Sequence, residues 1–167
     1  MNSTTRIDKV QLLASLRSRL ATELESATTA QQSTQAGAVH EESRPEDPKD
    51  TRALEATYLA RGLAERVVML QNAKIFLEGL QPRAFGDEDE IAVGAVVALQ
   101  DEASGVLSHY FIAPIVGGWK VRVGALEVTT LTPTAPLGRA LVGMYCDDPV
   151  EIHTPSGVRN CVIREVY

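Results

Sequence analysis

Hydrophobic residues in the first half of the chain recur at steps of three and four, the spacing of a helix with one apolar face. Arg, Glu, Gln and Ser occupy most of the positions between them. The pattern predicts two amphipathic helices, over 6–38 and 50–80. Their apolar positions are Leu13, Leu16, Leu20, Leu24 and Ala27, then Leu59, Leu63, Val67, Leu70, Ala73 and Leu77.

A short polar segment, residues 40–49, separates the two predicted helices and contains Pro45 and Pro48. Two helices joined in this way bury their apolar faces against each other, so we expect an antiparallel hairpin. At 1.5 Å per residue each helix is about 45 Å long. The pattern predicts no further element that would cover the hairpin. The hairpin is therefore expected to protrude as a rod with the connecting loop at its far end.

The second half of the chain has the character of a sheet domain. Residues 1–80 hold two of the eight aromatic residues and three of the twelve glycines, and the remainder follow. Strands are predicted at 91–100, 106–113, 119–123, 126–131, 150–153 and 158–167, with a short helix at 136–142. The predicted fold class is α+β, with a helical hairpin over 1–80 and a mainly antiparallel sheet domain with one short helix over 85–167.

Charge is distributed unevenly along the chain, which carries 16 Lys and Arg against 22 Asp and Glu for a net charge of −6. Residues 41–50, here called the acidic tip, contain five acids and two bases. The rest of 1–80 has six acids and eight bases. A pI near 5.1 argues against unaided binding to duplex DNA, which depends on basic residues. Contact with nucleic acid through a larger partner stays possible.

The acidic tip offers candidate metal ligands in Asp47 and Asp50, with Glu46 as a further candidate. Mg²⁺ prefers carboxylate oxygens and often shares them with waters and substrate phosphates. Such carboxylates suit phosphodiester hydrolysis completed in another enzyme's active site. A structural role fits equally well, because Asp47 can cap a helix that has Pro48 at its first position. The two roles are compatible, since a capping carboxylate can leave one oxygen free.

Three C-terminal segments carry a family resemblance: 135–143 (APLGRALVG), 149–157 (PVEIHTPSG) and 161–167 (CVIREVY). They resemble the Ser-Pro-x-x-x-Ala-Leu-x-Gly segment, the Val-x-x-x-Thr-Pro-x-Gly hairpin and the closing strand of the bacterial GreA/GreB transcript-cleavage factors. The resemblance extends over the whole chain and is closest over 85–167.

This resemblance implies a coiled-coil hairpin followed by an FKBP-like domain that docks on RNA polymerase at the rim of its secondary channel. The coiled coil enters the channel, and its tip acids help to hold a Mg²⁺ ion at the polymerase active site. The polymerase then cleaves the 3′ end of a backtracked transcript. The chain itself is expected to have no active site and no cofactor of its own, and to meet DNA only indirectly.

The family's tip pattern, Asp-x-x-Glu followed by Asn-Ala-Glu-Tyr, places its first two acids on Asp47 and Asp50. Asp50 replaces Glu, and residues 51–54 (TRAL) differ from the rest of the pattern. Arg52 and Arg61 on the second helix are candidates for approaching the RNA phosphates.

The docking loop implied by the resemblance is Thr134, Ala135 and Pro136, with Ala135 where the family usually has Ser.

Two alternatives remain open at this stage. One is a regulator that occupies the secondary channel without supporting cleavage. The other is a coiled-coil interaction module unrelated to transcription. No apolar run approaches the roughly 20 residues needed to span a bilayer, and the N-terminal residues lack a signal-peptide core. We therefore expect a monomeric cytoplasmic protein without membrane contact.

Overall fold

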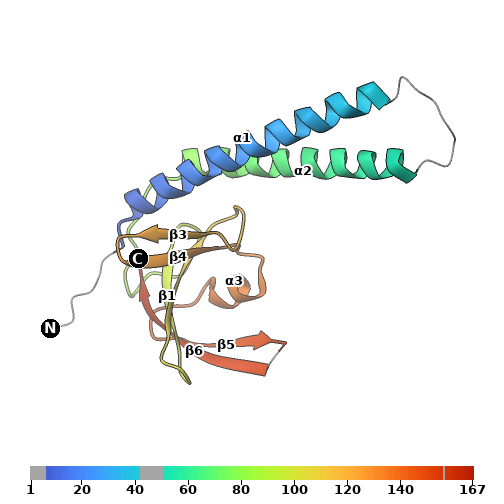
Figure 1. The fold of residues 1–167 in the computed structure, drawn as a ribbon. Coiled ribbons are helices and arrows are strands. Elements are labelled where there is room, and N and C mark those ends of the chain that lie inside the picture. Colours follow the sequence, from blue (N-terminus) through green and yellow to red (C-terminus); the bar gives the residue numbers. More distant parts are fainter. Residues whose placement is uncertain (1–6, 42–50, 156) are drawn as a thin grey trace.

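The computed structural model describes residues 7–41, 51–155 and 157–167 and shows a pair of long helices projecting from a sheet domain (Figure 1). Helix α1 (Lys9–Glu41) runs outward and α2 (Thr51–Gly79) returns. Six strands and one short helix follow. They are β1 (Val96–Asp101), β2 (Leu107–Ile112), β3 (Lys120–Val123), β4 (Leu126–Leu131), α3 (Pro136–Leu141), β5 (Pro149–Thr154) and β6 (Gly157–Val166).

The strands form one sheet in the order β3-β4-β2-β1-β6-β5. All neighbouring strands are antiparallel except β2 and β4, which are parallel. The predicted fold class, a helical hairpin with a mainly antiparallel sheet domain and one short helix, is confirmed. No helix in the described ranges is both long and apolar enough to cross a membrane.

The hairpin is tightly packed near the sheet and open toward its far end. Leu16 and Leu20 of α1 and Leu70 and Leu77 of α2 are at most 1% exposed. Toward the loop the two helices diverge (Figure 1). Leu59, predicted to lie on the buried face, is 58% exposed. That prediction was wrong because α1 is mostly polar over 28–36 and has no apolar side chain larger than Ala there to cover Leu59.

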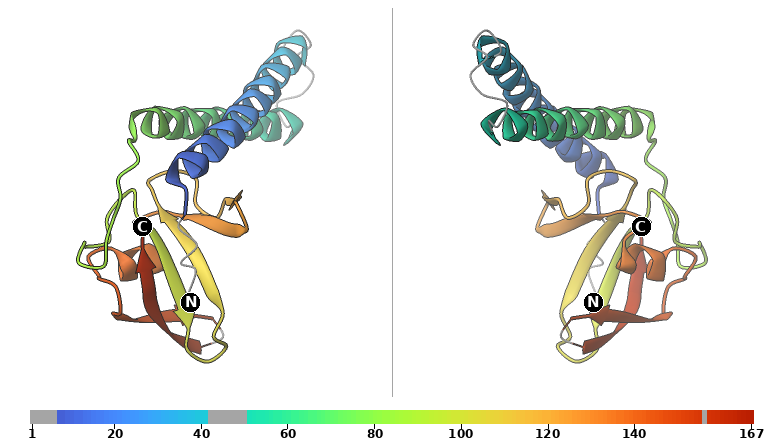
Figure 2. Two further views of the ribbon diagram at one scale, coloured as in Figure 1. Left: turned by 90° about the vertical axis from the view of Figure 1, so that its left-hand side faces the viewer. Right: turned by 90° about the vertical axis from the view of Figure 1, so that its right-hand side faces the viewer.

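The base of the hairpin shares a core with one face of the sheet. Leu12 and Leu13 of α1 belong to the same buried cluster as Phe111, Trp119 and Val128. Figure 2 shows the start of α1 lying over this end of the sheet. A second cluster on the opposite face joins Leu99 and Ile163 to Leu141 of α3, and Ile91 and Ile112 are among its other members. Strand β1 is therefore buried on both faces, since the hairpin covers one and α3 the other.

The first strand begins at Val96, five residues later than predicted. Ile91 instead exchanges backbone hydrogen bonds with the loop after α3, because its N–H donates to the Met144 carbonyl and its carbonyl accepts from Gly143. Gly94 then has a φ of +95°, which a residue with a side chain rarely adopts. The apolar run that predicted a longer strand is thus a loop anchored by the buried residues Ile91 and Ala95, followed by a strand.

Arg17 on α1 ties the two helices together at the C-terminal end of α2. Its Nε and Nη2 atoms donate to the Leu77 carbonyl at 3.0 and 2.6 Å, and Nη2 also reaches the Leu80 carbonyl at 3.3 Å. The last carbonyls of a helix lack partners within the helix and carry the negative end of its dipole. The Arg17 guanidinium donates hydrogen bonds to these carbonyls and places a positive charge at the negative end of the helix dipole.

We predict that Arg17→Ala lowers the free energy of unfolding by about 1–3 kcal/mol, since hydrogen bonds to a charged group are lost from the end of α2. Denaturant titration followed by circular dichroism measures the change. Arg61→Ala is the matched control, because Arg61 is exposed and its removal is expected to change stability by no more than about 0.5 kcal/mol. Equal effects of the two substitutions would contradict this role of Arg17.

Asp101 joins the β1–β2 turn to β6. Its Oδ1 accepts from the Ser104 N–H and hydroxyl, each at 2.8 Å, and its Oδ2 accepts from the Arg159 guanidinium at 2.8 Å. These donors lower the pKa of Asp101 to about 2, the Ser104 backbone N–H contributing most. All of them bind the ionised carboxylate more strongly than the neutral acid.

Asp101 should therefore make stability depend on pH in acid. Its folded-state pKa of about 2 lies below the ordinary value of 3.8, so its contribution is complete above about pH 4 and is lost as the pH falls toward 2. We expect the Asp101→Asn variant to lose less stability than the wild type over that interval, as measured by urea unfolding at each pH. Identical pH profiles would show that the carboxylate is not held in this way.

Candidate functional site

The three candidate metal ligands of the acidic tip, Glu46, Asp47 and Asp50, lie outside the described residues. Arg52 lies in the first turn of α2. Arg61, about two and a half turns further along, donates to the Glu65 carboxylate at 2.9 Å. The Arg61 and Glu65 side chains are 77% and 66% exposed, so the pair lies on the solvent side of the rod. The approach of Arg52 and Arg61 to RNA stays a prediction.

The predicted docking loop occupies the connection between β4 and α3. Thr134 and Pro136 are exposed and Ala135 is half-buried. The Ala135 N–H donates to the Thr132 carbonyl at 3.1 Å, which closes the turn, and Pro136 is the first residue of α3. Ala135 has the extended backbone of a capping residue but no side-chain cap. The loop therefore presents small and apolar groups on a fixed backbone.

Gly138 fixes the position of this loop. A Cβ atom at Gly138 would lie 2.0 Å from the Thr132 carbonyl oxygen and 3.1 Å from the Pro133 carbonyl carbon. Only a residue without a side chain lets α3 approach the loop backbone so closely. Gly138 thus lets α3 pack directly against the backbone of Thr132 and Pro133. In this arrangement Thr134 and Pro136 lie on the surface.

Polar contacts at the base of α1 set the direction of the rod. The Lys9 ammonium donates to the Arg83 carbonyl at 2.6 Å and the Gly94 carbonyl at 2.8 Å, and lies 4.4 Å from the centre of the Phe85 ring. Burial, with a smaller effect of the Arg83 cation, lowers the pKa of Lys9 to about 8. Lys9 thereby ties α1 to the segment that links α2 to the sheet.

A second contact lies at β3. The Arg19 guanidinium donates to the Lys120 carbonyl at 2.9 Å and stands 4.8 Å from the centre of the Trp119 ring. Such cation–π contacts contribute more where water is partly excluded. With Lys9, this contact holds the rod at two separate points of the sheet domain.

The metal-ligating side chains and the thiols of the described residues are dispersed or deactivated. Across 7–41, 51–155 and 157–167 no group of three or more His, Cys, Asp or Glu is placed to hold a metal ion. Cys146 and Cys161 are free thiols, and burial raises the pKa of each, which disfavours a nucleophilic thiolate. His109 is buried, and burial lowers its pKa.

One surface was missed by the pattern analysis: the outward face of α2. Five large apolar side chains on it are between 42% and 68% exposed, namely Leu54, Tyr58, Val68, Met69 and Ile75. The signal was present in the sequence, because Leu54, Val68 and Ile75 are separated by multiples of seven. It was hidden by the stronger stripe on the opposite face of the same helix.

Comparison with known families identifies the C-terminal half. The sequence model described as "Transcription elongation factor, GreA/GreB, C-term" matches residues 86–167. Residues 86–167 are therefore similar to the C-terminal domain of the GreA/GreB family. The match includes the docking loop, α3 and the β5–β6 hairpin, the segments that carried the resemblance.

Two curated relatives are similar over the same length of chain, and both are named transcription elongation factor GreA. The protein from Syntrophus aciditrophicus (strain SB) is 30% identical over 80 residues, which is 48% of this chain and 46% of that protein. The one from Syntrophobacter fumaroxidans (strain DSM 10017 / MPOB) is 29% identical over 80 residues, 48% of this chain and 47% of that protein. The chain thus spans about half the length of the curated relatives it matches.

Among solved structures, GreA factor homolog 1 (Gfh1) of Thermus thermophilus is similar at 22% identity, covering 93% of this chain and 92% of that one, with a TM-score of 0.39. A similarity of this size supports no inference about how the rod of this chain is oriented on its sheet.

We predict that Gly138→Ala displaces the docking loop and lowers the free energy of unfolding by about 1–3 kcal/mol, as expected for an atom forced into a packed site. Denaturant titration gives the energy, and amide chemical shifts of Thr134 and Ala135 report the displacement. The control is Arg139→Ala, on the exposed side of the same short helix. Unchanged Thr134 and Ala135 shifts in the Gly138→Ala variant would contradict the assigned role.

Proposed function

We propose that this chain is a transcription elongation factor that binds RNA polymerase at its secondary channel and stimulates cleavage of backtracked nascent RNA. The observation that carries the proposal is a long helical rod held firmly on a GreA/GreB C-terminal domain. The domain supplies the docking surface through Thr134, Ala135 and Pro136. The rod is the part that extends from the docked domain into the channel.

The dimensions of the rod support this division of work. With 33 residues in α1 and 29 in α2, the helices are about 50 and 44 Å long at 1.5 Å per residue. The C-terminal end of α1 and the N-terminal end of α2, which flank residues 42–50 in the sequence, lie at the end of the hairpin away from the sheet (Figure 1). A factor anchored at the mouth of a channel can therefore place the acidic tip deep inside a much larger enzyme. The factor acts in this proposal as a cytoplasmic monomer.

The chemistry proposed for the acidic tip follows from its donor set. Asp47 and Asp50, with Glu46 beside them, offer the hard oxygen ligands that Mg²⁺ prefers. A Mg²⁺ ion shared with the polymerase would supply activation of water for phosphodiester hydrolysis. The chain contributes carboxylates and their placement, and the polymerase contributes the rest of the active site. No cofactor belongs to the factor alone.

A second candidate function keeps the docking and omits the cleavage. It is favoured by the residues after Asp50, because Thr51-Arg-Ala-Leu54 differs from the Asn-Ala-Glu-Tyr of the family, and Asp50 itself is shorter than the Glu it replaces. Such a factor would occupy the secondary channel and inhibit or retune the polymerase.

The deciding experiment adds purified factor and Mg²⁺ to stalled, backtracked elongation complexes and follows the RNA 3′ end. We expect shortening of the transcript that Asp47→Ala or Asp50→Ala slows by at least about tenfold, since even outer-shell partners of a metal contribute about 10–100-fold. Binding to the polymerase should persist in both variants. Glu25→Ala, an acid on the side of α1, is the control and should leave cleavage unchanged.

Other results of this experiment would identify a different function. Polymerase binding without any transcript shortening would identify the non-cleaving regulator. Cleavage that survives both tip substitutions would remove Asp47 and Asp50 from the chemistry. Absence of binding to core RNA polymerase would favour an interaction module unrelated to transcription.

A further inference from the structure

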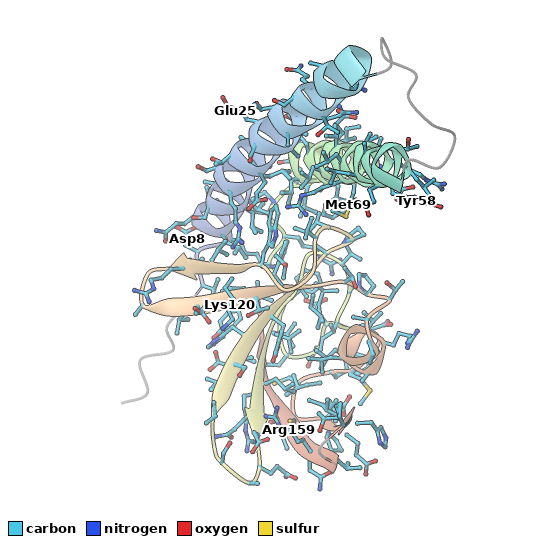
Figure 3. The ribbon with its side chains drawn as sticks, turned by 45° about the vertical axis from the view of Figure 1, so that its right-hand side comes forward. Asp8, Glu25, Tyr58, Met69, Lys120 and Arg159 are labelled. Atoms are coloured by element: carbon cyan, nitrogen blue, oxygen red, sulfur yellow. The ribbon has the colours of Figure 1, made fainter. Side chains whose placement is uncertain are left out.

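A cavity of about 440 Å³ lies where the start of α1 meets the segment that links α2 to the sheet. Ile7, Val10 and Phe85 are among the residues that line it, and Lys9 contributes an amine. Figure 3 shows the neighbouring Asp8 at the end of α1 that lies next to the sheet domain. Cavities of this size accommodate small organic ligands.

The Lys9 amine is held in this cavity by two backbone acceptors. Its Nζ atom donates to the Arg83 carbonyl at 2.6 Å and to the Gly94 carbonyl at 2.8 Å. Both bonds persist when Nζ loses a proton, because a neutral amine keeps two N–H groups. The lone pair that replaces the third N–H then points away from both carbonyls. Since Lys9 is half-buried and not enclosed, a reagent in the cavity can approach this lone pair.

The surroundings of Lys9 favour the neutral amine. Burial, with a smaller effect of the Arg83 cation, lowers the pKa of Lys9 from the ordinary 10.5 to about 8. At pH 8 about half of the Lys9 amine is therefore neutral, whereas a lysine with the ordinary pKa is less than about 1% neutral. Burial and a neighbouring cation activate lysine nucleophiles in this way.

Among the described residues, Asp8, Arg83 and Tyr167 are the other titratable groups that line the cavity. Asp8 Oδ1 accepts from the first N–H groups of α1 at 2.9 and 3.1 Å. The Tyr167 hydroxyl donates to the Glu165 carboxylate, and burial raises the pKa of Tyr167, so the hydroxyl is uncharged at pH 8. Asp8 and Tyr167 are thus engaged within the chain, which leaves Arg83 to bind a ligand.

Arg83 is placed to bind a phosphate group beside Lys9. Its guanidinium lies 4.5 Å from the centre of the Phe85 ring, and Lys9 Nζ lies 4.4 Å from the same centre. The Arg83 side chain is 65% exposed, and Nη2 makes its ion pair with Asp89 at 3.3 Å. A guanidinium offers five N–H donors and binds phosphate through pairs of them. A cation for a phosphate and a nucleophilic amine therefore meet at one ring.

We propose that Lys9 is a site of acylation by small acyl phosphates, with Arg83 binding the phosphate group. In the reaction the Lys9 nitrogen forms a bond to the acyl carbon, and the bond between that carbon and the phosphate oxygen breaks. Inorganic phosphate leaves with the electron pair, and the nitrogen releases one proton to solvent. The product is a neutral amide. This modification does not depend on the function proposed above.

Acylation of Lys9 would weaken the attachment of α1 to the linking segment. The amide nitrogen has one N–H group, so it can donate to the Arg83 carbonyl or to the Gly94 carbonyl but not to both. The positive charge beside the Phe85 ring, which attracts the face of the ring, is also lost. The modification would therefore act at one of the two points that hold the rod on the sheet domain.

Incubation of the full chain with acetyl phosphate at pH 8, followed by peptide mass spectrometry, tests the proposal. We expect Lys9 to be acetylated at least about tenfold faster than Lys74 or Lys120, because about half of its amine is neutral at this pH. Lys74 and Lys120 are internal controls, since their side chains are 54% and 64% exposed and would react first if exposure decided the rate. Equal or slower acetylation of Lys9 would overturn the proposal.

The pH dependence of the reaction is a second readout. The acetylation rate of Lys9 should level off above about pH 8, whereas that of Nα-acetyl-lysine free in solution should keep rising toward pH 10. A Lys9 rate that rises in parallel with that of the free amino acid would contradict an activated amine.

Two reagents separate recognition of the phosphate from the reactivity of the amine. Arg83→Ala should slow the reaction of Lys9 with acetyl phosphate at least about tenfold, as expected when hydrogen bonds to a charged group are lost. It should slow the reaction with N-hydroxysuccinimide acetate, which carries no phosphate, by less. Arg122→Ala, which removes an exposed cation from β3, is the matched control and should leave both rates unchanged. Circular dichroism verifies that each variant is folded. Equal slowing with the two reagents, or none with either, would overturn the assignment to acyl phosphates.

Discussion

The packing of the hairpin base against one face of the sheet is the contact on which the rest of the structure depends. Two helices side by side bury only one stripe each, and the far half of this pair is open. Near the sheet, Leu12, Leu13 and Leu16 join both the partner helix and the strands in one cluster. The strands are thus a third layer beside the two helices, and they fix the base of the hairpin against the sheet. Arg17, Lys9 and Arg19 then hold it by hydrogen bonds to backbone carbonyls.

The same arrangement explains where contact surfaces can occur. Because the hairpin covers one face of the sheet and α3 the other, β1 has no exposed face. The loop Thr134–Pro136, proposed above to contact a partner, is held against α3 by the close approach of Gly138 to the Thr132 carbonyl. The rod offers its outer faces and the acidic tip. This architecture fits the proposed function, in which the factor places groups on a partner, and residues 86–167 are similar to the C-terminal domain of the GreA/GreB family.

The sequence pattern predicted the helices and most strands because local spacing decides them. The step of three and four identified Leu16, Leu20, Leu70 and Leu77 as core, and all are buried. Burial that depends on distant elements was less predictable. Leu59 lies on the predicted stripe and is nevertheless exposed, because α1 turns polar and diverges from α2 toward the far end of the hairpin.

In the candidate site, too, features set by local sequence were predictable, and features set by contacts between distant segments were not. The start of α3 could be predicted, because Pro136 at a first helical position is a local signal, and Pro136 is the first residue of α3. The docking role of Thr134, Ala135 and Pro136 stays a prediction. The clash that requires Gly138 could not be predicted, since it depends on how closely α3 approaches Thr132. The outer face of α2 was overlooked because two apolar faces on one helix weaken the amphipathic signal of each.

Photo-cross-linking from two positions of the chain tests the central claim most directly. A photoreactive residue in place of Thr134 should attach to the outer rim of the polymerase channel. The same residue in place of Leu54, near the far end of α2, should attach to the polymerase active site or to the RNA 3′ end of a backtracked complex. Attachment from both positions to the outer surface, or from neither, would contradict a docked domain with an inserted rod.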